Sequence, residues 1–169
     1  DKLKKAVDKY GNSNVFILTA RGPGSQKAIH DWLKSNGINI PLKNITGLWI
    51  FEECRRTWRK EGFTPELTEL ISLAEKSTFT SIIDPNNLLF ATPGDMPHKV
   101  ARFCRESNQP EPQSHGDYIR CIFISLALAY KKTLEEIEAV TGKKITKIHI
   151  LGGGSQIHLL NQMASDATG

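Results

Sequence analysis

A run of apolar and β-branched residues leads directly into three consecutive glycines near the carboxyl end of the chain. The run covers residues 145–151, the glycines are residues 152–154, and Ser155 and Gln156 follow. β-Branched residues favour an extended strand, and glycine has no Cβ to obstruct a sharp reversal of the backbone. Apolar residues then recur at helical spacing from residue 159 onward. The sequence therefore predicts a strand, a glycine turn and a helix in immediate succession.

A glycine turn of this kind lets a ligand approach the bare backbone. The first N–H groups of a helix have no partner inside the helix, and the helix dipole favours an anion there. The turn is therefore a candidate binding site for a phosphate or a nucleotide. A tight strand-to-helix turn with no ligand is an equally open alternative.

Further motifs stand upstream of the turn in a defined order. They are Asn44-Ile-Thr-Gly-Leu-Trp49, Glu53-Cys-Arg-Arg56, Pro65-Glu-Leu-Thr-Glu-Leu-Ile71, Ile83-Asp-Pro85, Pro93-Gly-Asp-Met-Pro97 and Ile119-Arg-Cys121. Together with residues 149–169, they resemble the FGGY carbohydrate kinases, most closely those that act on L-rhamnulose. The resemblance covers roughly residues 44–169.

This resemblance implies a fold class and an activity. The fold would be α/β, a helix-rich part of an actin-like, ribonuclease-H-like ATPase domain, and the family transfers the γ-phosphoryl group of ATP to a sugar hydroxyl with Mg²⁺. The family's first domain and catalytic aspartate precede everything matched here. We therefore expect a kinase fragment that is not competent alone, with no catalytic residue and no metal ligand of its own.

The same resemblance places the nucleotide on the glycine turn. The expected nucleotide-binding residues are Gly152, Gly153, Gly154, Ser155, Gln156 and Asn161, with Gln156 and Asn161 beside the adenosine. One position departs from the family pattern, because Ile157 stands where an Asn is expected. Losing one amide hydrogen bond would cost about 0.5–1.5 kcal/mol of affinity, so weaker binding is expected. Ile157 could instead pack the first turn of the helix.

The first quarter of the chain resembles a different family. Residues 15–18 predict a buried strand, flanked by a helix over residues 3–10 and another from Ser25 to Gly37. This short α-β-α unit, with the wording Val15-Phe-Ile-Leu-Thr-Ala-Arg21, resembles haloacid dehalogenase phosphohydrolases. The resemblance implies a phosphate-binding role for Thr19. The aspartate nucleophile of that family is not in place, so this unit is expected to be inert.

These two resemblances predict two parts, 1–47 and 48–169, joined by a linker around residues 44–48. Besides the kinase fragment, two functions stay open: a non-enzymatic nucleotide-binding or interaction module, and a phosphohydrolase fragment. Metal-dependent hydrolysis of a phosphomonoester would favour the phosphohydrolase.

Charge and composition narrow the class of protein. Residues 1–47 carry eight Lys and Arg against three Asp, whereas the remainder is nearly balanced. The basic residues are not interleaved with aromatics, so nucleic-acid binding is not expected. No apolar run reaches the roughly 18 residues of a membrane span, and we expect no membrane partner and a cytoplasmic location. Three widely spaced cysteines, Cys54, Cys104 and Cys121, predict buried thiols rather than a metal site.

Within the kinase-like part, the pattern predicts mostly helices. These are a helix over residues 49–60, one capped by Thr64 with Pro65 first, one beginning at Asp95, and a long one over residues 117–140 ending at Thr141-Gly142. Asp117 is predicted to cap the long helix, in preference to forming a catalytic triad with the neighbouring Ser114 and His115. The long helix should be the centre of packing.

Overall fold

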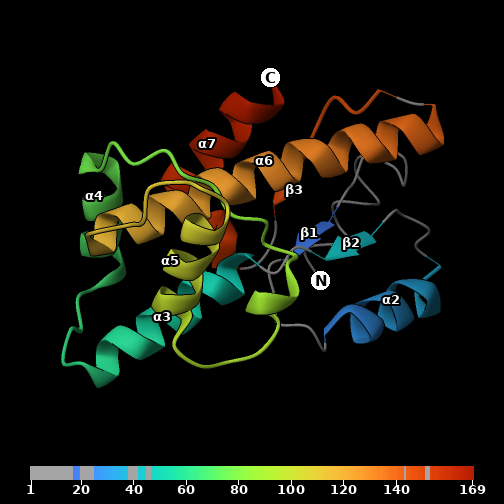
Figure 1. Cartoon of the computed structure of the whole chain (residues 1–169). Coiled ribbons are helices and arrows are strands. Elements are labelled where there is room, and N and C mark those ends of the chain that lie inside the picture. The colour runs from blue at the N-terminus through green and yellow to red at the C-terminus, as the bar shows by residue number, and fades with distance from the viewer. Residues whose placement is uncertain (1–16, 20–24, 38–41, 45–46, 143, 151–152) are drawn as a thin grey trace.

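The computed structural model describes residues 17–19, 25–37, 42–44, 47–142, 144–150 and 153–169. Helices dominate this part of the chain, and the long helix α6 (His115–Thr141) runs across the molecule with the other elements around it (Figure 1). The other helices are α2 (Ser25–Ser35), α3 (Gly47–Lys60), α4 (Leu67–Lys76), α5 (Met96–Glu106) and α7 (His158–Thr168), with the 3-10 helices η1 (Leu88–Phe90) and η2 (Gly153–Gln156).

Helix α6 is the centre of packing, as the sequence predicts. It contacts α3, α4 and α7. Its buried apolar residues recur every three or four positions and include Ile119, Ile122, Phe123, Leu126 and Tyr130. Complete burial of each such side chain contributes roughly 1.5–3 kcal/mol. The predicted end of the helix is confirmed, because Gly142 takes the left-handed conformation with φ 67° at the C-cap.

Aromatic packing joins α3 to α6 inside the core. The ring of Phe51 meets that of Phe123 edge to face, with centroids 5.3 Å apart. Both side chains have no exposed surface. Trp49 lies nearby on α3, and its indole Nε1 donates a hydrogen bond to the carbonyl oxygen of Phe90 at 3.1 Å. The helix predicted from residue 49 forms as α3, which begins two residues earlier, at Gly47.

Two predicted helix caps are wrong. The N-cap of α6 is Ser114, whose hydroxyl accepts a hydrogen bond from the backbone N–H of Asp117, while the Asp117 carboxylate accepts one from the backbone N–H of Ser114. In such a capping box the acidic residue stands three positions after the cap, so Asp117 is not itself the cap. Helix α4 is capped at Glu66 rather than Thr64, and Glu69 accepts from the Glu66 N–H. The cap at Asp95 is confirmed.

The described strands form one small parallel sheet in the order β2-β1-β3. They are β1 (Ile17–Thr19), β2 (Leu42–Asn44) and β3 (His149–Ile150), and Ile17 stands opposite both Leu42 and His149. The strand predicted over residues 145–151 is thus only two residues long. The strand predicted over residues 15–18 is confirmed at residues 17 and 18, and the helix from Ser25 is confirmed. Residues 15 and 16 and the helix predicted over residues 3–10 lie outside the described residues.

The division at the expected linker around residues 44–48 stays a prediction. Asn44 ends the strand β2, and α3 begins at Gly47. Since β1 pairs with both β2 and β3, strands from the first quarter of the chain and the strand before the glycine turn belong to one sheet.

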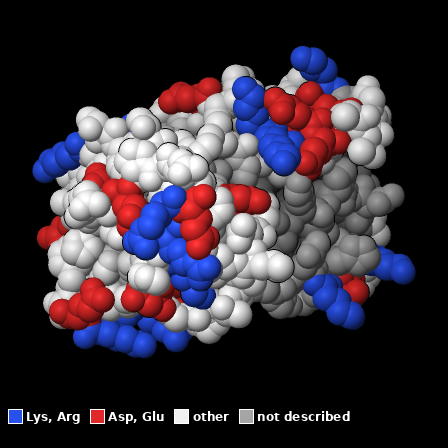
Figure 2. Space-filling view, in the orientation of Figure 1, with Lys and Arg blue, Asp and Glu red and all other residues white. Residues whose placement is uncertain are grey.

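The viewed surface carries charges of both signs (Figure 2), and the cysteines lie inside. Figure 2 shows positive and negative side chains interspersed on the viewed face. Across the described part of the chain, no helix is both long and apolar enough to cross a membrane. Cys54, Cys104 and Cys121 are free and buried, as predicted.

Candidate functional site

The helix predicted after the three glycines forms, and a 3-10 turn that includes Gly153 and Gly154 precedes it. The chain leaves β3, passes through residues 151–152 outside the described set, and winds into η2 before α7 begins at His158. The backbone N–H of Ile157 donates to the carbonyl oxygen of Gly154 at 3.1 Å, and that of Asn161 donates to Ile157 at 3.0 Å. These bonds link the turn to the first turn of the helix.

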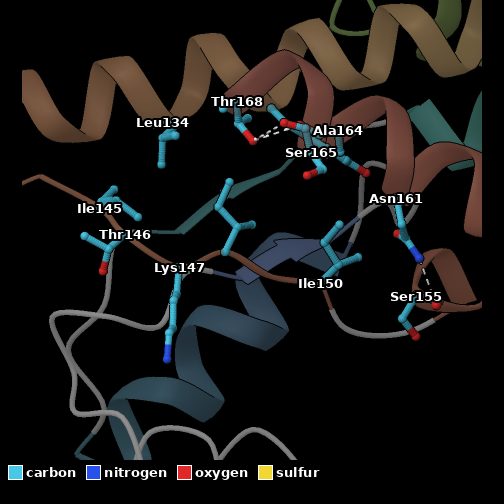
Figure 3. Close-up of a pocket in the computed structure, with 13 residues that line it drawn as sticks. Leu134, Ile145, Thr146, Lys147, Ile150, Ser155, Asn161, Ala164, Ser165 and Thr168 are labelled. Carbon is cyan, nitrogen blue, oxygen red and sulfur yellow. Dashed lines mark hydrogen bonds between the residues drawn. The ribbon is translucent and has the colours of Figure 1, made fainter.

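A cavity of about 460 Å³ lies beside this turn. Its walls come from the carboxyl half of α6, from residues 145–150 and from one face of α7 (Figure 3). Cavities of roughly 300–1,000 Å³ are typical of small-molecule sites. The cavity is therefore large enough to hold a nucleoside-sized ligand.

One end of the cavity is polar. Asn161 and Ser155 lie there together, and the Asn161 Nδ2 donates to the carbonyl oxygen of Ser155 at 3.0 Å. The Asn161 Oδ1 is buried and has no hydrogen-bond partner among the described residues. Ser165 and Thr168 continue this polar line along α7, and the Thr168 hydroxyl donates to the carbonyl oxygen of Ala164 at 2.8 Å.

The opposite end of the cavity is more apolar. Figure 3 shows Leu134 and Ile145 at this end, with Thr146 beside Ile145, while the Lys147 side chain extends away from α6 and α7. Tyr130 also lines the cavity, and its burial raises the pKa of its phenol to about 12. This group therefore stays neutral in the physiological range, so the aromatic wall of the cavity carries no charge.

The predicted nucleotide-binding residues are only partly gathered at this cavity. Ser155 and Asn161 line it. Gly154 is buried and turned inward, because a Cβ on it would stand 3.0 Å from Leu48 Cδ1. Gln156 is exposed and is not part of the lining. Gly153 begins η2, and Gly152 lies outside the described residues.

Two other predicted positions have different outcomes. Ile157 packs in the core with 3 % of its surface exposed, so it stabilises the first turn of α7. This result confirms the packing role that was one of the two predicted for it. Thr19 ends β1, but its side chain lies outside the described set, and its phosphate-binding role stays a prediction.

Ser165 and Thr168 line the cavity but were not predicted. They stand four and seven positions after the predicted Asn161, which places all three on one face of α7. This spacing was the available signal. The contribution of Tyr130 and Leu134 could not be foreseen, because it depends on how α6 passes the residues before β3.

A second, more open cavity lies where α4 ends and α6 begins. It measures about 420 Å³ and is lined by Ser77, Ser114, His115 and Asp117, among others. Here the Ser114 hydroxyl bonds the helix backbone, and the His115 ring stacks on Phe63 with centroids 4.0 Å apart. These hydrogen bonds and the ring contact hold the start of α6 in place.

The family of this chain is shown by its similarity to known proteins. The C-terminal domain of the FGGY family of carbohydrate kinases matches residues 11–169. The chain belongs to the FGGY carbohydrate kinase family. The match includes most of the first quarter, which also supplies two strands of the sheet. Family membership implies an actin-like ATPase fold, of which the structure describes a helix-rich portion.

Individual relatives agree with this family. The chain is 41% identical over 128 residues to the rhamnulokinase of Bacteroides thetaiotaomicron, covering 76% of this chain and 26% of that protein. It is 40% identical over 140 residues to the rhamnulokinase of Enterococcus faecalis, covering 81% and 28%. The rhamnulokinase of Oceanobacillus iheyensis is 35% identical over 128 residues. The chain therefore spans about a quarter of the length of these relatives.

Proposed function

We propose that this chain carries the nucleoside-binding part of an ATP-dependent sugar kinase whose acceptor is L-rhamnulose. The observation that supports it best is the cavity beside the glycine turn, in a chain that belongs to the FGGY family. The acceptor sugar is inferred from the similarity to rhamnulokinases. The division of the chain into parts 1–47 and 48–169 and a cytoplasmic location are further proposals, both from the sequence.

The cavity fits the nucleoside end of ATP. Apolar side chains at one end can contact the faces of a base, and the polar end offers the Asn161 amide and the Ser155 hydroxyl. Bound ATP would supply the phosphoryl group that the sugar receives. The residues of this chain would hold and orient the nucleoside, which is the part of phosphoryl transfer that depends on positioning.

The described residues fit Mg²⁺ less well than they fit a nucleoside. None of the described residues form a group of three or more His, Cys, Asp or Glu placed to hold a metal ion. We therefore assign no step through the metal to this part of the chain. In the proposed kinase, the metal and the catalytic base would be held by residues other than those described.

The first test of this proposal is an activity measurement. We expect no release of ADP above background when the chain is mixed with ATP, Mg²⁺ and L-rhamnulose, because the lining of the cavity contains no Asp, Glu or His to act as a base. ADP release that requires both ATP and L-rhamnulose would contradict this expectation. ATP binding without turnover would be shared by the alternative function, a non-enzymatic nucleotide-binding module.

The second test is a binding measurement. Titrated ATP should shift the amide resonances of residues 153–161, with an affinity in the millimolar range, because only the nucleoside end is held. Gly153→Val should weaken these shifts, because a branched side chain obstructs approach to the backbone. Gln162→Val is the control, since Gln162 is exposed on α7 outside the cavity lining. Equal shifts in both variants would show that the turn is purely structural.

A further inference from the structure

The end of α2 carries an asparagine directly before a glycine, Asn36 and Gly37, and this pair occurs nowhere else in the chain. Both residues are exposed. Gly37 takes the left-handed conformation with φ 67°, and a Cβ placed on it would meet no atom of the described residues within 4 Å. Because glycine has no side chain, nothing of its own shields its backbone nitrogen. The peptide bond between Asn36 and Gly37 is therefore open to solvent.

The Asn36 side chain helps to close the last turn of α2. Its Nδ2 donates to the carbonyl oxygen of Trp32 at 2.8 Å and to the Ser35 Oγ at 3.3 Å. The last carbonyl groups of a helix have no partner inside the helix, so a side-chain donor satisfies one of them. The amide of Asn36 thus has a structural role that depends on its N–H groups.

The Gly37 nitrogen is held by a hydrogen bond at this helix end, in which its N–H donates to the carbonyl oxygen of Lys34 at 3.1 Å. Helix ends open locally at a far lower cost than the core does. Opening of this last turn frees the Gly37 nitrogen, and the buried core around α6 does not have to unfold.

We propose that Asn36 is a site of spontaneous deamidation and that loss of its amide loosens the last turn of α2. The Gly37 nitrogen gives its proton to solvent and forms a bond to the Asn36 Cγ, and the Cγ–Nδ2 bond breaks as ammonia leaves. Water then opens the resulting cyclic imide at either of its two carbonyl groups. The products are an aspartate and an isoaspartate, whose backbone runs through the side-chain carbon.

Neither product can replace the amide in the turn. A carboxylate only accepts hydrogen bonds, so the carbonyl group of Trp32 loses its side-chain donor. The new negative charge also lies at the C-terminal end of α2, where the helix dipole favours a positive charge. We therefore expect the amides that close this turn to exchange hydrogen faster after the reaction.

The test incubates the unmodified chain at pH 8 and 37 °C and follows the tryptic peptide of residues 35–43, which Lys34 and Lys43 delimit. Fragmentation in a mass spectrometer locates the conversion of amide to acid, and an isoaspartate-specific carboxyl methyltransferase with a labelled methyl donor measures the isoaspartate. Asn108 is the control within the chain, because it is exposed beyond the end of α5 but precedes Gln109. We expect Asn36 to convert at least roughly fivefold faster than Asn108, since only Asn36 has an unshielded nitrogen after it.

A variant assigns the reaction to the glycine. Gly37→Ala should slow the conversion of Asn36 at least roughly fivefold, because a methyl group shields the attacking nitrogen. Alanine is strained at a positive φ, so this variant also loosens the turn, and slower conversion in spite of that identifies the glycine as the cause. Equal rates at Asn36 and Asn108, or an unchanged rate in Gly37→Ala, would overturn the proposal. If Gly37→Ala does not fold, the comparison of Asn36 with Asn108 decides the matter.

The effect on α2 has its own measurement. Asn36→Asp imitates one product, and the amides of residues 33–36 should exchange hydrogen roughly two- to fivefold faster in it, as a wrongly placed charge at a helix end allows. Asn36→Ala removes the donor without adding a charge, so its change should be smaller. Asn108→Asp is the control and should leave α2 unchanged. Exchange in Asn36→Asp that equals that of the parent chain would overturn the loosening of α2.

Discussion

Two buried glycines differ in what faces their missing Cβ. At Gly116, an added Cβ would stand 2.4 Å from the carbonyl oxygen of Leu73, so helix α6 approaches α4 too closely for any side chain. At Gly154, the nearest atom is the Leu48 Cδ1 at 3.0 Å, which is the end of a side chain. Backbone cannot move aside cheaply, whereas a methyl group can.

We therefore expect Gly116→Ala to lower the free energy of unfolding by about 1–3 kcal/mol. Gly154→Ala should lower it by less, about 1 kcal/mol at most, by the same reasoning on a movable neighbour. Urea denaturation of the two variants beside the parent chain measures both changes. Equal losses would contradict the close approach of the two helices at Gly116.

His115 provides a pH dependence at the scale of one residue. Its ring stacks on Phe63 and meets Trp58 edge to face with centroids 4.7 Å apart. Burial lowers the pKa of His115 from 6.5, and the charge of Glu61 opposes this only in part. Because the unfolded chain then binds the proton more readily, the stability that His115 contributes is present above pH 6.5 and is lost as the pH falls through the lowered pKa.

The measurement is the free energy of unfolding between pH 7.5 and pH 5, compared with His115→Phe. One proton permits a slope of up to about 1.4 kcal/mol per pH unit, and we expect the slope below pH 6.5 to be smaller in the variant. Other groups contribute equally to both proteins. A slope that is unchanged by the substitution would remove His115 as its cause.

At the scale of elements, Asp117 connects the start of α6 to the end of α4. Its carboxylate accepts from the backbone N–H groups of Ser114 and Gln113 at 3.1 and 3.2 Å, and from the Ser77 hydroxyl at 2.6 Å. Burial tends to raise the pKa of Asp117, but these hydrogen bonds outweigh burial and lower it. The stabilisation is therefore present above the ordinary value of 3.8 and is lost in acid.

We expect Asp117→Ala to cost more than a simple cap does, about 2–3 kcal/mol against about 1 kcal/mol for Asp95→Ala. Asp95 is the matched control, because among the described residues its side chain accepts one hydrogen bond, from the backbone N–H of His98 at the start of α5. A double-mutant cycle with Ser77→Ala should show a coupling of about 0.5 kcal/mol or more. If the Asp117 and Asp95 variants lose equal stability, the link to α4 contributes nothing.

At the scale of the whole molecule, the end of the sheet at β3 bears on association between molecules. Among the described strands, β3 stands at one end of the order β2-β1-β3, so one of its sides has no strand partner there. Ile150, in β3, and Ile148, just before it, are part of the wall of the cavity beside the glycine turn. An unpaired strand edge with apolar neighbours favours pairing between molecules.

We expect the chain to associate as its concentration rises, in sedimentation velocity at low salt and neutral pH. Ile148→Lys should reduce the associated fraction, because a charge beside an edge strand opposes pairing. The control is Val140→Lys, which adds the same charge at a residue 88 % exposed on α6. A monomer at all concentrations would contradict this expectation.

Much of the local structure could be read from the sequence. Helical spacing of apolar residues predicted α3, α5 and α6, and Gly142 predicted where α6 ends, because the residue types act through contacts within a few positions. The glycine turn and the helix α7 were predicted for the same reason. The caps at Ser114 and Glu66 were assigned incorrectly, since several polar residues near each helix start could take the position and only the backbone geometry chooses among them.

The tertiary structure alone decided how distant segments meet. The sequence by itself determined that the chain is helix-rich, that a glycine turn precedes α7, and that the motifs are those of the FGGY family. It could not show that β2 and β1 join β3 in one sheet, that Gly154 lies against Leu48, or that Asn161 shares a cavity with Tyr130 and Leu134. Local patterns express the preferences of neighbouring residues, whereas these contacts depend on how α6, β3 and α7 pack against one another.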